Sequence, residues 1–126
     1  MTLSFVQTDA APRAIGPYSQ AVRCGALIFC SGQLPTDPVT GVFVGDDIED
    51  QTRQCLKNLA AILEAADIRL DRVVKTTVFL KNMEDFAKMN AIYEEEFASH
   101  RPARSTIEVA RLPKDALVEI EAVASL

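Results

Sequence analysis

The sequence is poor in the residues that most often build metal sites and nucleophilic triads. Its 126 residues contain no tryptophan, one histidine and three cysteines. The cysteines, Cys24, Cys30 and Cys55, lack CxxC spacing, which argues against a zinc cluster or a disulfide framework. A single histidine, His100, leaves no apparent Ser-His-Asp triad, and the HxE and PCxxC motifs of zinc deaminases are absent. The sequence therefore predicts no metal site.

Motifs for nucleotides, nucleic acids and membranes are missing as well. Neither GxxxxGK[ST] nor GxGxxG occurs, so no nucleotide cofactor is expected. Thirteen basic residues against eighteen acidic ones give a net charge of −5 without a basic run, which disfavours binding to a phosphate backbone. No apolar run approaches the ~20 residues that cross a bilayer, and no signal-peptide pattern is present. We therefore expect a cytoplasmic protein that does not bind membranes. Binding to nucleic acid is not expected either.

The length and the hydrophobic pattern predict one domain, residues 1–126, of the α+β class. Hydrophobic residues make up 48% of the chain, which is ample for a single core. Residue periodicity and turn signals predict elements in this order: strands at 3–8, 21–24 and 26–31, a helix at 48–66 capped by Asp46, a strand at 72–80, a helix at 82–98 capped by Asn82, and two strands between 102 and 124. This order predicts a mixed sheet with both helices on one face.

The last two strands carry alternating charges. Arg104 falls on one face of the first strand, whereas Glu119 and Glu121 share a face of the second. If the two strands pair as antiparallel neighbours around residues 112–113, Arg104 lies near one of these glutamates. An arginine fits a substrate carboxylate and a nearby glutamate can activate water, so the pattern indicates a small-acid site. The alternative is a solvated strand face with a surface ion pair.

The sheet face without helices is expected to carry Arg104, Glu108, Glu119 and Glu121. Charges among smaller apolar residues are compatible with a solvated face or with a subunit interface. Because symmetric homo-oligomers are common, we favour an oligomer.

Two loop segments are further candidates for a ligand site. Tyr18 lies in a loop shaped by Pro17 just before a strand, from where it can reach a pocket. Ser31 and Gly32 end a buried strand, where a glycine permits a ligand to approach the backbone. The alternatives are a packing tyrosine and a simple strand-ending turn.

Taken together, the motifs resemble the Rid family, also called YjgF or reactive intermediate deaminases, and specifically its RidA branch. The matching segments stand in the family's order over nearly the whole chain: IGPYSQA at 15–21, SGQLP at 31–35, QTRQCLKNL at 51–59, VVKTTVFLKNMEDFAKMN at 73–90 and RPARSTIEVARLPKDALVEIEA at 101–122. The resemblance implies a chorismate-mutase-like fold and a homotrimer with ligand clefts between subunits.

The resemblance also implies roles for individual residues. Arg104 matches the arginine that grips the substrate carboxylate, Glu119 the acid that positions or activates water, and Tyr18 a tyrosine of the cleft. Further substrate-binding positions are matched by Ser31, Gly32, Asn90 and Thr106. RidA members often have cysteine at position 106, so this chain offers a hydroxyl there in place of a thiol.

The activity implied by the resemblance is metal-free hydrolysis of C=N bonds. Its substrates are 2-iminobutanoate and 2-iminopropanoate, with their enamine tautomers, which arise from amino-acid dehydratases and are converted to 2-oxo acids and ammonia. One alternative is a regulatory trimer that binds small carboxylates without turnover and needs Arg104 but not Glu119. A second, an endoribonuclease or translation inhibitor, is disfavoured by the acidic composition.

Overall fold

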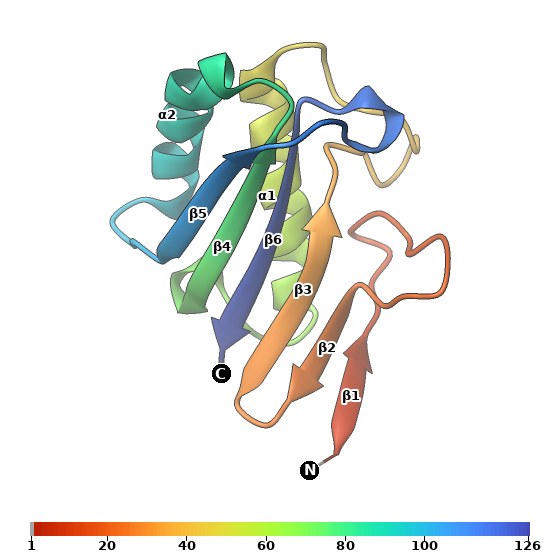
Figure 1. The fold of residues 1–126 in the computed structure, drawn as a ribbon. Helices are drawn as coiled ribbons and strands as arrows, with labels where there is room; N and C mark the ends of the chain where they lie inside the picture. Colours follow the sequence, from red (N-terminus) through yellow and green to blue (C-terminus); the bar gives the residue numbers. More distant parts are fainter. Residues whose placement is uncertain (1) are drawn as a thin grey trace.

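The protein forms one mixed sheet with two α-helices packed on the same side of it (Figure 1). The computed structural model describes residues 2–126. The elements, in chain order, are β1 (Leu3–Val6), β2 (Ala21–Cys24), β3 (Leu27–Gln33), α1 (Ile48–Glu64), β4 (Val73–Leu80), α2 (Phe86–Phe97), β5 (Ala103–Glu108) and β6 (Val118–Ser125), with 3-10 turns η1 (Leu70–Arg72), η2 (Met83–Asp85) and η3 (Pro113–Asp115). The predicted α+β class, with both helices on one face, is confirmed. No helix in residues 2–126 combines the length and apolarity that crossing a membrane requires.

The strands lie in the order β1-β2-β3-β6-β4-β5. β6 pairs antiparallel with both β3 and β4, whereas β5 runs parallel to β4. A parallel pair needs a crossover connection, and α2 supplies it between β4 and β5. β6 is therefore an interior strand, although it is the last strand of the chain.

The predicted antiparallel pairing of β5 with β6 is wrong, because β4 lies between them. The connection from β5 to β6 passes across the end of β4. There the Val109 N–H donates to the Leu80 carbonyl at 2.9 Å, and the Lys81 N–H donates to the Leu117 carbonyl at 3.0 Å. Strand alternation determines which residues share a face, but it does not determine which strands are neighbours.

Helix α1 begins at Ile48 as predicted, but its capping residue and the start of α2 differ from the prediction. α1 is capped by Asp47 rather than Asp46, and the Asp47 carboxylate accepts the Asp50 N–H at 2.7 Å. Asn82 does accept a backbone N–H, that of Glu84 at 2.9 Å, but it caps the turn η2, and α2 begins only at Phe86. Aspartates in succession leave the cap position ambiguous at the level of sequence.

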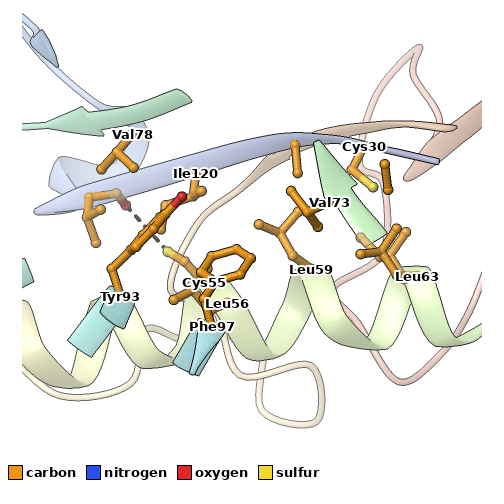
Figure 2. Close-up of a cluster of buried hydrophobic side chains, with 14 of the residues drawn as sticks. Cys30, Cys55, Leu56, Leu59, Leu63, Val73, Val78, Tyr93, Phe97 and Ile120 are labelled. Atoms are coloured by element: carbon orange, nitrogen blue, oxygen red, sulfur yellow. Dashed lines mark hydrogen bonds between the residues drawn. The ribbon is translucent and has the colours of Figure 1, made fainter. Parts of the chain in front are cut away.

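The core lies between α1, α2 and the sheet, and Figure 2 shows its side chains. Leu59 and Leu63 of α1 are fully buried against the sheet. The Tyr93 hydroxyl of α2 lies 2.7 Å from the Thr76 hydroxyl of β4, which satisfies both polar groups inside the core. Burial raises the pKa of the Cys30 thiol to about 12, so this cysteine is a packed thiol and not a reactive one.

Leu59→Ala tests how tightly this core is packed. Leu59 has no exposed surface, so its truncation leaves a cavity and is expected to lower the free energy of unfolding by about 2–5 kcal/mol. The control is Val39→Ala, which shortens a side chain that is 91% exposed and should change stability by less than about 0.5 kcal/mol. Urea denaturation of both variants makes the comparison, and equal losses would contradict the assigned core.

Candidate functional site

Arg104 of β5 lies on the face of the sheet that α2 covers. In the parallel register it stands beside Thr76, which is buried beneath α2. Its guanidinium carbon lies 4.7 Å from the Tyr93 ring centre and 5.5 Å from the Phe86 ring centre. Its Nη1 donates to Asn90 Oδ1 at 2.8 Å. Two ring contacts and one hydrogen bond therefore hold the cation in a defined orientation.

The charge of Arg104 has no partner acid. Within residues 2–126, none of the ion pairs involves Arg104. The guanidinium borders a hollow of about 280 Å³ whose wall also includes Tyr93, Glu94, Arg101 and Pro102. A guanidinium has five donors, and the structure uses one of them on Asn90. Arg104 therefore keeps donors for a planar anion such as a carboxylate.

Thr106 lies two residues further along β5, on the same face as Arg104. Its Oγ1 is buried and has no hydrogen-bond partner. Buried hydroxyls are normally satisfied, so this atom is a candidate to bond a ligand. Arg104, Asn90 and Thr106 form one group, which we call the arginine cluster.

Glu108 also lies on this face, where it accepts the Met83 N–H at 2.8 Å. The prediction that Arg104 and Glu108 lie on the open face is therefore wrong.

Glu119 of β6 lies on the open face of the sheet, as predicted. Its neighbours Val118 and Ile120 point into the core beneath the helices, so Glu119 points the other way. The carboxylate lies against Gly32 of β3, where an added Cβ would come within 2.1 Å of Oε2. Burial, and secondarily the charge of Glu121, raises the pKa of Glu119. The absence of a side chain at position 32 thus makes room for this half-buried acid.

Within one subunit, Arg104 and Glu119 are not neighbours. They lie on opposite faces of the sheet, and β4 separates their strands. The prediction that Arg104 lies near Glu119 or Glu121 through direct pairing of the two strands is therefore wrong. Within each strand the charged residues share one face. The charges of β5 lie on the face covered by the helices, whereas those of β6 lie on the open face.

Ser31 of β3 is hydrogen-bonded to the loop that contains Tyr18. Its hydroxyl donates to the Ser19 carbonyl at 2.6 Å, and its N–H donates to the Gln20 carbonyl at 2.9 Å. Tyr18 itself is 53% exposed and lines a second hollow of about 280 Å³ beside β1. We call Glu119, Gly32, Ser31 and the Tyr18 loop the acid cluster. The seven predicted site residues therefore fall into two clusters rather than one.

Two residues of the arginine cluster's surroundings were not predicted as functional. The rings of Phe86 and Tyr93 both lie against the Arg104 guanidinium. With Asn90 they are spaced i, i+4 and i+7, which places all three on one face of α2. That spacing was the available signal. Within the described part of the chain, no group of three or more His, Cys, Asp or Glu residues is arranged to hold a metal ion.

Comparisons with known proteins agree with the resemblance seen in the sequence motifs. A RutC family protein of Pyrococcus horikoshii is 58% identical over 117 residues, covering 93% of each chain. A protein of Salmonella typhimurium named 2-iminobutanoate/2-iminopropanoate deaminase is 52% identical over 122 residues, covering 94% of each. The structure of Escherichia coli TdcF with bound serine superposes with a TM-score of 0.94 at 44% identity, covering 98% of each chain.

The family profile described as Endoribonuclease L-PSP matches residues 8–126. The match therefore includes every strand and helix that bears a residue of the two clusters. On this match and these identities, the chain belongs to the Endoribonuclease L-PSP family, which is the YjgF or Rid family.

Proposed function

We propose that the protein is a deaminase that hydrolyses small 2-imino acids, and their enamine tautomers, to 2-oxo acids and ammonia. The observation that carries the proposal is the Arg104 guanidinium, which is oriented by Asn90 and two rings but has no acid partner. A relative that is 52% identical is named for this activity on 2-iminobutanoate and 2-iminopropanoate. We propose the same substrates for this chain.

Arg104 binds the substrate carboxylate in this mechanism. Its fork of N–H donors matches the two oxygens of a carboxylate, and the adjoining hollow of about 280 Å³ has room for a molecule of three or four carbons. The Thr106 hydroxyl, which has no partner in the subunit, accepts or donates one further hydrogen bond. Binding in this way fixes the C=N carbon relative to the protein.

A second copy of the chain supplies the acid. Since the sheet separates Arg104 from Glu119, one subunit cannot present both to a molecule of this size. We propose a homotrimer in which the arginine cluster of one subunit faces the acid cluster of the next. The opposite charges of the two clusters favour this contact, and cyclic symmetry repeats it three times.

Glu119 then acts as general base and general acid in turn. It accepts a proton from water as the water oxygen bonds to the imine carbon and the C=N π pair moves to nitrogen. The same proton passes to nitrogen, the C–N bond breaks, and the oxygen lone pair forms the C=O bond while the hydroxyl proton goes to ammonia. Tyr18 lines the proposed cleft beside the acid and helps to position the substrate there. An iminium is electrophilic already, so positioning and a base of this kind suffice.

A non-catalytic binder of small carboxylates is the second candidate. The arginine cluster is complete within one subunit, and the TdcF structure contains bound serine. Such a protein would need Arg104 but not Glu119, and this difference separates the two functions. An endoribonuclease, the activity in the family's description, fits poorly with a net charge of −5.

Substitution of Arg104 and Glu119 tests the deaminase. The assay follows 2-oxobutanoate release from a threonine dehydratase, with semicarbazide trapping free imine. Arg104→Ala removes charge-assisted bonds of about 1.5–3 kcal/mol, so we expect kcat/KM to fall roughly 10- to 100-fold. Glu119→Gln removes the base and should cost about 10²–10⁴-fold, mainly in kcat.

The matched controls for these variants are Arg69→Ala and Glu64→Gln, which change exposed residues of the same types. Both should retain wild-type activity. Full activity in Glu119→Gln would exclude this residue as the base, and unchanged 2-oxobutanoate release on adding wild-type protein would favour the binder.

Mixing two impaired variants tests the shared cleft. If Arg104 and Glu119 of one site come from different subunits, co-refolding Arg104→Ala with Glu119→Gln should restore about one quarter of wild-type activity, because random association rebuilds that share of clefts. Each variant refolded alone is the control. No recovery in mixed oligomers of verified composition would show that both residues act from one subunit.

A further inference from the structure

A second carboxylate lies beside Glu119 on the open face. Glu121 is two residues further along β6, about 7 Å away along the strand, and lies opposite Thr77 of β4. It is exposed, and none of the ion pairs in residues 2–126 involves it. With Phe29, Lys75 and Val123 it borders a shallow hollow of about 180 Å³. Neither the relatives' names nor the proposed mechanism assigns Glu121 a role.

The effect of the Glu121 charge on Glu119 depends on whether other charged groups near Glu119 offset it. β3 contributes Gly32 and Phe29, which carry no charge. β4 contributes Phe79 directly opposite Glu119, and Lys75 further along. The Lys75 ammonium donates hydrogen bonds to the Thr76 carbonyl at 3.1 Å and to the hydroxyls of Ser105 and Thr77 at 3.4 and 3.5 Å.

The strands β3 to β6 therefore present one cation and two carboxylates on this face within one subunit, and the cation bonds neutral oxygens. In the proposed trimer the partner's Arg104 also faces Glu119, but it is present in the wild type and in every Glu121 variant alike, so it does not change the sign of the difference between them. The Glu119 carboxylate lies against Gly32 and is half-buried. Two like charges held on one strand face repel each other, and binding a proton relieves the repulsion.

We propose that Glu121 is a positioning residue whose negative charge makes Glu119 a stronger base toward the attacking water. The proposal rests on the deaminase function described above. Glu121 does not touch the substrate in this scheme and acts only through Glu119. The strand spacing places the two residues about 7 Å apart on one face, and the Glu119 carboxylate lies against Gly32.

The sign of the effect follows from the charges. Burial and Glu121 both raise the pKa of Glu119. Replacing Glu121 by a neutral residue of the same shape removes the second contribution, so the pKa of Glu119 falls. The acidic limb of the pH profile, where Glu119 becomes protonated and inactive as a base, must then move to lower pH. At neutral pH the weaker base should lower kcat a few-fold, as general-base catalysis follows basicity.

The experiment compares Glu121→Gln, Glu121→Asp and the control Glu64→Gln. One readout is the pH profile of kcat/KM in the dehydratase assay, corrected for spontaneous hydrolysis. The other is a ¹³C NMR titration of the Glu119 carboxyl in the intact protein without substrate. We expect Glu121→Gln to lower both the NMR midpoint and the acidic limb. Glu121→Asp keeps the charge and should restore both toward wild type, and Glu64→Gln should leave both unchanged.

An NMR midpoint that does not move in Glu121→Gln overturns the proposal, since the two carboxylates would then be uncoupled. A midpoint that moves while the kinetic limb stays in place also overturns it, because Glu119 would not be the kinetic base. These results differ from failure of the deaminase function itself. In that case the wild-type protein would lack activity at every pH.

Discussion

Strand β6 lies between β3 and β4, and this placement governs both faces of the sheet. Its backbone is hydrogen-bonded on both sides, so the direction of each of its side chains is determined by the sheet. Val118 and Ile120 must point under the helices, and Glu119 and Glu121 must point to the open face. The same pairing brings Gly32 of β3 against the Glu119 carboxylate. One strand thus connects the core with the acid cluster.

The arginine cluster depends on a different pairing, that of β5 with β4. The crossover through α2 makes β5 parallel to β4 and places Arg104 and Thr106 on the face that this helix covers. Tyr93 serves two neighbours there: its hydroxyl bonds Thr76 in the core, and its ring lies against Arg104. Core packing and orientation of the cation are consequently coupled through one aromatic residue.

A single subunit holds the two clusters on opposite sides of its sheet. Each cluster is internally ordered, the first by Asn90 and the second by Gly32 and the Ser31 contact with the Tyr18 loop. Under the proposed function, association of subunits turns two incomplete sites into a complete one. The same arrangement would make catalysis depend on assembly, because neither cluster alone contains both a group that binds the substrate carboxylate and a base.

Periodicity, strand alternation and the family motifs were enough to predict the class of the fold, most of the helix and strand segments, and the seven residues proposed for the site. It also placed Glu119 and Glu121 together, since strand alternation is a local property. The separation of β5 from β6 by β4, which places Arg104 and Glu119 on opposite faces, became visible only in the folded chain. Periodicity shows which side chains share a face, whereas strand order depends on long-range hydrogen bonding and burial that no short segment encodes.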